Sequence, residues 1–294
     1  MQLSSSECFT WFAVFLTVCV AIVTVNLLSI ILFIKNRSLR TRVMYLVINL
    51  TIADMFVGGF SHFYLFRFHS YACDIVKMNE ILEMALIIFF LHIWFPLTSL
   101  TNIAVISLDR MHATIRPFRH RLIKKWVYGV TIAGVWVLAA MVTAMFLIPP
   151  LLFIEYFFGI YFTLSYCCFC LFVICVSYSS IVVKFLCGAH PQHHGAANRQ
   201  RKLTVTLFIM TIVSLLMWLP YAVYIFLPFS IIKFSSVEES LSRLQFPLII
   251  LSLMNSLVNP IVYTIRIPEF RKALLVLFKR QRRQNARDIP LHAL

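Results

Sequence analysis

The chain has 294 residues, of which 61% are hydrophobic and 13% are charged, and it carries a formal net charge of +15. A soluble domain of this length cannot bury so much apolar surface, so the composition excludes a soluble globular protein and indicates a membrane protein. The basic residues lie between apolar runs instead of on one domain, which argues against nucleic-acid binding.

Seven apolar runs are each long enough to cross a bilayer, which takes about 20 residues of helix. They cover residues 9–34, 43–66, 85–111, 127–148, 157–186, 203–227 and 244–265. We therefore expect an all-α membrane protein with a seven-transmembrane helix bundle over residues 9–265. A short extracellular segment (1–8) is expected before it. A short amphipathic eighth helix (268–278) and a basic cytoplasmic tail (279–294) are expected after it.

Lysine and arginine in the loops predict the orientation of the bundle. The loops after the first, third and fifth runs and the C-terminal segment are strongly basic. The opposite loops hold only Arg67, Lys77, Lys233 and Arg243. The expected protein is thus a multi-pass plasma-membrane protein with an extracellular N-terminus and a cytoplasmic C-terminus.

Polar residues inside the apolar runs mark candidate functional sites, because a charge in hydrocarbon is costly. Asp54 lies in the second run and needs partners there. Oxygens for a small cation beside it are offered by Ser99, Asn255, Ser256 and Asn259. A protonated, neutral Asp54 in a hydrogen-bonded cluster explains the same pattern, and the residues alone leave both interpretations open.

Asp109 and Arg110 end the third run, just before a basic segment. The acid pairs with the arginine and lowers the cost of placing it at the membrane edge, although an arginine extending from a helix end to the interface fits equally well. Pro220 in the sixth run and Pro260 in the seventh each remove a helix hydrogen bond and bend their helices. Bent helices beside a polar core are typical of a protein that switches between two states.

Together these residues resemble the rhodopsin-like (class A) family of G-protein-coupled receptors. The resemblance covers about residues 10–280 and rests on motifs in the family's order: Asn26, Asn49-Leu50 with Ala53-Asp54, Asp109-Arg110-Met111 with Pro117, Trp136, Tyr178, Trp218-Leu219-Pro220, Asn259-Pro260-Ile261-Val262-Tyr263, and Phe270-Arg271. It implies a receptor, not an enzyme, which converts the binding of an extracellular small molecule, lipid or short peptide into activation of a heterotrimeric G protein. The expected partners are therefore a G protein, an extracellular ligand and the lipid bilayer.

The resemblance also implies roles for individual residues. On activation, Arg110 is expected to release Asp109 and meet the G protein. The residues of this switch are Asp109, Arg110, Tyr178, Asn259, Pro260 and Tyr263. The residues similar to the family's allosteric sodium site are Asp54, Ser99, Asn255, Ser256 and Asn259. No cofactor other than this sodium ion is expected.

Several positions depart from the family pattern. Ala85 stands where the family has a cysteine of its usual disulfide, whereas Cys8 and Cys73 both lie on the expected outer side and are candidates for a different bridge. Gln200 replaces an acid that often locks the sixth span to the arginine, which suggests high basal activity as a hypothesis. The missing disulfide, the missing span-five proline and the short second outer loop resemble the melanocortin-related branch, although Asn259 departs from the aspartate usual there.

The candidate ligand-pocket residues are His92, Tyr166, Trp218, Tyr221 and Gln245. His92 occupies the position at which amine receptors of the family carry an aspartate, which disfavours an amine ligand. The seventh run lacks the lysine that holds retinal in opsins, which disfavours a photoreceptor. A packing role for His92 and for the aromatic residues stays open.

Other functions compete with the receptor interpretation. A transporter often shows repeated halves with broken helices, and the sequence has no visible repeat. An intramembrane enzyme is disfavoured because no second catalytic carboxylate and no metal-spaced cluster accompanies Asp54. The alternatives that remain are a seven-helix transporter or channel-like protein, and a diverged receptor that no longer couples to G proteins.

Overall fold

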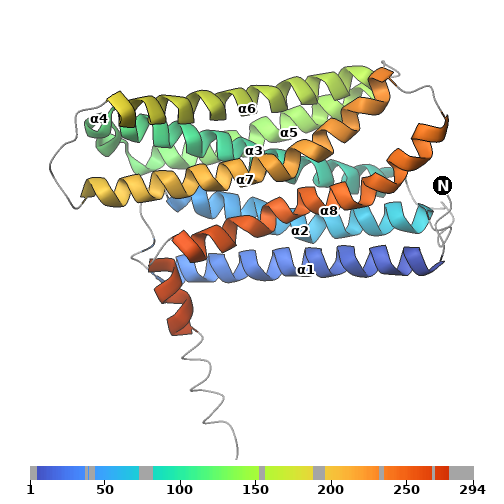
Figure 1. Cartoon of the computed structure of the whole chain (residues 1–294), viewed down its shortest axis with the longest axis horizontal. Helices are drawn as coiled ribbons and strands as arrows, with labels where there is room; N and C mark the ends of the chain where they lie inside the picture. Colours follow the sequence, from blue (N-terminus) through green and yellow to red (C-terminus); the bar gives the residue numbers. More distant parts are fainter. Residues whose placement is uncertain are drawn as a thin grey trace, which may run out of the picture.

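The computed structural model describes residues 5–36, 39, 44–72, 82–151, 156–187, 196–231, 235–266 and 269–277. Its helices are α1 (Ser5–Lys35), α2 (Met44–Ala72), α3 (Leu82–Ile115), α4 (Pro117–Leu122), α5 (Lys125–Leu151), α6 (Tyr156–Cys187), α7 (Ala196–Ile231) and α8 (Ser235–Arg266). Residues 269–277 form a further helix. The long helices run side by side in one elongated bundle (Figure 1).

Seven described helices are long and apolar enough to cross a membrane. The candidate spans are Ser6–Lys35, Met44–Ser61, Met84–Ile115, Lys125–Ile148, Phe158–Lys184, Thr204–Tyr224 and Leu244–Ile265. Large apolar side chains such as Leu16, Val137 and Phe172 point outward from the bundle and are exposed. A helix that is apolar on its outer face as well as its inner face is suited to lipid on the outside. The predicted all-α, seven-helix membrane bundle is confirmed.

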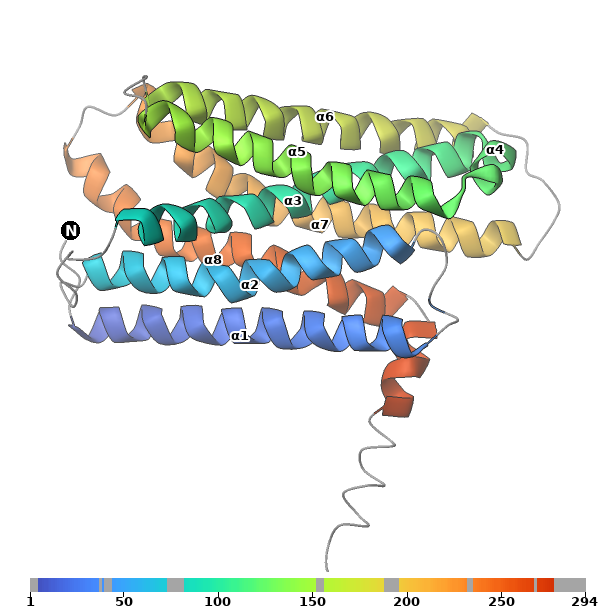
Figure 2. The ribbon, with the colours of Figure 1, turned by 180° about the vertical axis from the view of Figure 1, so that it is seen from behind.

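Helix α3 is the central element of the bundle. It contacts α2, α5, α6 and α7, while α1 packs on α2 and α8 at one side. Figure 2 shows α3 crossing the bundle between α2 and α5. Its buried side chains include the polar residues Ser99, Asn102 and Ser107 as well as Arg110. The central helix therefore carries polar groups into the bundle at several levels.

The helix over residues 269–277 turns away from α8 at the end of the bundle (Figure 1). Phe270 anchors it, because this ring is buried and lies 5.4 Å from the ring of Phe33 on α1, centroid to centroid. Arg271 and Lys272 on the same helix are exposed. One apolar anchor and a basic exposed side are what an amphipathic helix at an interface requires.

Helix α4 is a short helix between α3 and α5 that the sequence reasoning did not predict. Pro117 is its first residue, and proline suits that position because the first backbone N–H of a helix has no partner within the helix. The backbone N–H of His120 donates to the carbonyl of Arg116 (3.0 Å) and closes its first turn. This turn brings His120 back toward α3, 11 residues after Asp109 in the chain.

Cys8, near the start of α1, is buried and disulfide-bonded. The partner that the sequence suggested, Cys73, lies outside the described residues. Among the described cysteines, those with a free thiol are Cys19, Cys167, Cys168, Cys170 and Cys175.

Candidate functional site

Asp54 of α2 is fully buried at the first polar centre of the bundle. Ser99 Oγ of α3 donates to Asp54 Oδ1 at 2.8 Å, and Ser256 Oγ of α8 donates to the same oxygen at 2.9 Å. Asn259 Nδ2 of α8 donates to Asp54 Oδ2 at 2.6 Å. Three of the four predicted partners thus contact the carboxyl group and tie α2, α3 and α8 together.

Asn255 is the fourth predicted partner, and no hydrogen bond from it to Asp54 is present among the described residues. On a helix, Asn255 and Ser256 lie on opposite sides of Asn259, by about 40° and about 60° respectively. Asp54 lies on the Ser256 side. Asn26 of α1 reaches the same region, because its Nδ2 donates to the backbone oxygen of Ser256 at 3.0 Å.

Several buried oxygens of this centre have unused capacity as acceptors. The side-chain oxygens of Asn26, Asn255 and Asn259 have no hydrogen-bond donor among the described residues. Carboxylate and amide oxygens are the ligands that hard cations prefer. Buried water molecules also donate hydrogen bonds to such oxygens. The residues around Asp54 therefore fit a small hydrated cation.

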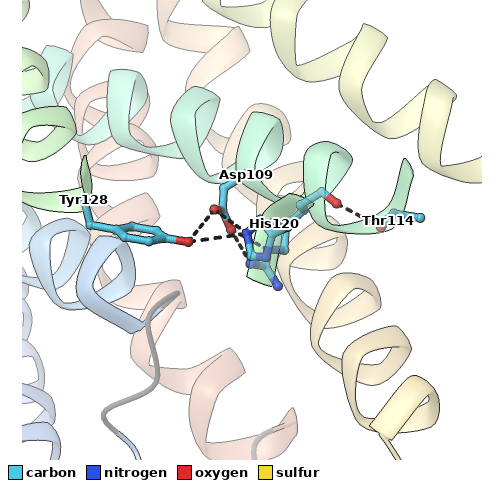
Figure 3. A network of polar contacts seen from close by, with 5 residues as sticks. Asp109, Thr114, His120 and Tyr128 are labelled. Atoms are coloured by element: carbon cyan, nitrogen blue, oxygen red, sulfur yellow. Dashed lines mark hydrogen bonds and ion pairs between the residues drawn. The ribbon is translucent and has the colours of Figure 1, made fainter. Parts of the chain in front are cut away.

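Asp109, near the C-terminal end of α3, is the second polar centre (Figure 3). Arg110 Nε donates to Asp109 Oδ2 at 3.1 Å, and Arg110 Nη2 forms an ion pair with the same oxygen. The hydroxyl of Tyr128 on α5 donates to Asp109 Oδ1 at 3.1 Å, and His120 Nε2 on α4 lies 2.9 Å from that oxygen. One carboxylate thus joins three helices at the end of the bundle.

Arg110 itself is almost completely buried, with 1% of its surface exposed. A buried guanidinium is stable only if it is paired and hydrogen-bonded. Asp109 supplies that pairing from the adjacent position in the chain, and its own side chain is 10% exposed. The pair is therefore closed to most of the surrounding solvent in this structure.

The two tyrosines of the predicted switch lie apart, each with its own neighbours. The Tyr178 hydroxyl of α6 lies 3.1 Å from Thr211 Oγ1 of α7. Tyr263 of α8 is fully buried, and its ring lies 6.0 Å from Phe33 and 6.1 Å from Phe270, centroid to centroid. Asn259 contacts Asp54, and Pro260 is buried within α8. The predicted switch residues thus lie on α3, α6 and α8 and do not form one cluster.

Two predicted pocket residues make contacts between helices. His92 Nδ1 of α3 lies 3.3 Å from Ser61 Oγ of α2, and the Tyr166 hydroxyl of α6 lies 2.7 Å from Thr101 Oγ1 of α3. These contacts support the packing role that the sequence left open for His92. The remaining predicted pocket residues are partly buried: Trp218, Tyr221 and Gln245.

The partners of Asp109 outside α3 were missed by the sequence reasoning. His120 follows Asp109 by 11 residues, in a segment that was described only as basic, and Tyr128 follows it by 19 residues, at the start of the fourth apolar run. The available signal was Pro117, which favours the first position of a helix. A short helix there turns the chain back, so that residues after it lie near the end of α3.

Comparison with known proteins supports this architecture. Residues 25–263 match the family described as "7 transmembrane receptor (rhodopsin family)". The chain is 23% identical over 299 residues to the Substance-K receptor of Mesocricetus auratus, covering 92% of this chain and 75% of that one. It is 22% identical over 290 residues to the blue-sensitive opsin of Anolis carolinensis, covering 85% and 75%.

Among solved structures, the crystal structure of squid rhodopsin has the same fold as this chain. The TM-score is 0.71 at 18% identity, and the alignment covers 95% of this chain and 87% of the other. The melanocortin-related branch is not tested by these comparisons and stays a prediction.

Proposed function

Because this chain belongs to the rhodopsin family of seven-transmembrane receptors, we propose that Asp109 and Arg110 form the switch through which it activates a heterotrimeric G protein. Members of this family are multi-pass plasma-membrane receptors without enzymatic activity. They convert the binding of an extracellular ligand into G-protein coupling. The predicted receptor function is confirmed by the family match and by the receptors among its relatives.

The observation that carries the proposal is the burial of Arg110 against Asp109 at the end of α3. In this state the guanidinium is occupied by the carboxylate and hidden from a cytoplasmic partner. When Arg110 separates from Asp109, up to five N–H donors of its guanidinium become free at the end of the bundle. The inactive state is therefore the one in which the pair is closed. Because a G protein binds from the cytoplasm, we propose that α4 and the 269–277 helix lie on the cytoplasmic side and the N-terminus on the outer side. The basic residues in the loops support this orientation.

The Asp54 centre is proposed as an allosteric sodium site that stabilises the inactive state. Three hydrogen bonds already fix the carboxyl group between α2, α3 and α8. The side-chain oxygens of Asn26 and Asn259, which have no donor among the described residues, support the presence of a further ligand there. A cation bound between α2, α3 and α8 opposes any motion that separates these helices, because the separation breaks its ligand set.

The ligand is proposed to be an extracellular small molecule, lipid or short peptide that reaches His92, Tyr166, Trp218, Tyr221 and Gln245. Substance K is a reasonable first probe, since the relatives include Substance-K receptors from several mammals. Binding of substance K that is unchanged by Trp218→Ala and by Tyr221→Ala would argue against this pocket.

The test is second-messenger output, cyclic AMP and calcium, in cells that express the chain or Arg110→Ala at equal surface level. The parent is expected to give a signal above mock-transfected cells that falls roughly tenfold or more in Arg110→Ala. Lys125→Ala is the matched control, because Lys125 is an exposed basic residue at the same end of the bundle, and we expect it to keep the signal. A parent without signal that also binds none of the Gα classes would contradict coupling and favour a diverged receptor.

A further inference from the structure

A groove on the outside of the bundle lies apart from the two polar centres. It has a volume of about 630 Å³ and is lined by α6, from Phe172 to Lys184, together with Ile115 of α3. We call it the α6 groove. Its apolar side chains Phe172, Val176 and Val183 are all exposed. Because α6 is long and apolar enough to cross a membrane, this exposed apolar surface lies against lipid.

The length of the α6 groove matches one leaflet of a bilayer. Its lining residues on α6 recur at alternating steps of three residues and one, which keeps them on one face of the helix. Lys184 follows Phe172 by 12 residues, so this face is about 18 Å long at 1.5 Å per residue. The hydrocarbon of one leaflet is about 15 Å thick, half of the bilayer core. The groove therefore suits the acyl chain of a single lipid.

The chemistry of the groove changes along its length. Phe172 and Val176 form the apolar end, and the hydroxyls of Ser179 and Ser180 follow one turn later. Ser180 Oγ donates to the carbonyl of Val176 at 2.8 Å, whereas Ser179 Oγ is exposed and has no hydrogen bond among the described residues. Lys184 lies about one turn further, in the last turn of α6. Acyl chains, ester oxygens and phosphate follow one another in this order along a phospholipid.

The charge at the end of the groove selects the headgroup. Lys184 is exposed, and no acidic side chain is present among the described residues that line the groove. Arg116, next to Ile115 in the chain, is a second exposed basic residue. The C-terminal end of α6 lies beside α4 in both views (Figures 1 and 2), at the end of the bundle proposed to be cytoplasmic. The cytoplasmic leaflet is the one that carries anionic lipids.

We propose that the α6 groove binds one phospholipid of the cytoplasmic leaflet, with an anionic headgroup at Lys184 and an acyl chain between Phe172 and Ile115. Lys184 provides the preference for an anionic headgroup, because the choline of a zwitterionic lipid offsets the charge of its phosphate. The apolar face holds the chain of either lipid. The bound lipid bridges α6 and the end of α3 and stabilises their packing. The inference rests on the proposed orientation of the receptor and adds a lipid site that needs no G protein.

The experiment measures lipid binding to the purified full chain in nanodiscs of phosphatidylcholine. The nanodiscs contain a small, equal fraction of a probe lipid that carries a photoreactive group on its acyl chain. The probe is phosphatidylserine in one sample and phosphatidylcholine in the other. After illumination, mass spectrometry counts the adducts on the segment of α6 from Phe172 to Lys184.

For the parent we expect about fivefold more adducts from phosphatidylserine than from phosphatidylcholine, the ratio for one basic residue at an anionic surface. Lys184→Gln is expected to make the two probes equal, and Lys184→Arg is expected to keep the preference. Lys35→Gln is the matched control, because Lys35 is an exposed basic residue in the last turn of α1 and does not line the groove. We expect it to keep the preference as well.

A second pair of variants tests the groove independently of charge. Val176→Trp places a large side chain in the middle of the groove and is expected to lower the adducts of both probes severalfold. Val137→Trp is the matched control, because Val137 is an exposed valine of α5 outside the groove. It is expected to change neither value. Thermal unfolding checks that each variant is folded as the parent is.

Equal adducts from the two probes in the parent, or a preference that survives in Lys184→Gln, would overturn the inference. So would adducts that Val176→Trp leaves unchanged. If α6 instead cross-links to α6 of another copy and takes no lipid, the groove is an interface between copies and the proposal fails. Nucleotide exchange is measured on the same samples: a lipid preference without exchange refutes only the proposed coupling, and exchange without a lipid preference refutes only the lipid site.

Discussion

Replacing Ser99 with alanine distinguishes a charged Asp54 from a protonated one. The substitution removes the hydroxyl that donates to Asp54 Oδ1 at 2.8 Å and leaves the donors Ser256 and Asn259 in place. Ser177→Ala is the matched control, because Ser177 is equally buried on α6 but donates to the carbonyl of Val173 in its own helix at 2.7 Å. The comparison therefore isolates the bond to the carboxyl group.

The expected cost depends on the charge state of Asp54. A hydrogen bond to a charged group contributes about 1.5–3 kcal/mol to stability, whereas an interhelical bond between neutral groups in a membrane protein averages about 0.6 kcal/mol. For a charged Asp54 beside sodium we expect Ser99→Ala to lower the free energy of unfolding by about 2 kcal/mol. Ser177→Ala is expected to cost less than about 1 kcal/mol.

Thermal unfolding of the purified protein, in sodium chloride and in choline chloride at equal ionic strength, provides the assay. Sodium at about 100 times its dissociation constant stabilises the folded state by about 2.7 kcal/mol. Asp54→Asn is expected to abolish this gain. An equal gain from sodium in Asp54→Asn and the parent would refute the site, and equal losses in Ser99→Ala and Ser177→Ala would refute a charged Asp54 and favour the protonated alternative.

Two further predictions concern packing and the outer end of the bundle. In Gly159→Ala the new Cβ lies 2.6 Å from a backbone oxygen of α5, so we expect a loss of about 1–3 kcal/mol in thermal unfolding. Gly134→Ala, with nothing within 4 Å of its Cβ, is expected to gain about 0.5–1 kcal/mol, and equal effects of the two would contradict the close approach. Peptide mapping without reduction is expected to join Cys8 to Cys73, the other cysteine on the outer side. A free Cys8 thiol, or a different partner, would disprove the pairing.

The sequence was a good guide to the residues around Asp54 because the resemblance supplied their roles in advance. Ser99, Ser256 and Asn259 contact the carboxyl group as expected. Asn255 was expected in the same set, and the structure shows no bond from it to Asp54 among the described residues. The difference lies in the rotation of α8 about its axis, which the order of residues along the helix does not specify.

The environment of Asp109 was less predictable. Its pairing with Arg110 follows from their adjacent positions, but His120 and Tyr128 reach it only because α4 turns the chain back and α5 packs beside α3. On one continuous helix, residues 11 and 19 positions apart are separated by several turns and cannot touch, so no pattern along the chain indicates these contacts. Tyr263 was likewise expected in the switch, while its packing against Phe33 of α1 depends on how α1 and α8 meet.

The sequence by itself determined that this protein is a seven-helix membrane receptor with Asp54 and Arg110 in its spans. The thickness of the bilayer sets the length of each apolar run, so the spans can be counted in the sequence. Burying a charge in hydrocarbon is costly, so a charged residue within a run indicates a functional site. Only the tertiary structure decided which atoms meet these charges: the donors to Asp54, the orphaned oxygens beside it, and the shared carboxylate of Asp109. Those contacts depend on the rotation of each helix and the path of each loop, since bonds of 2.6–3.1 Å tolerate almost no displacement.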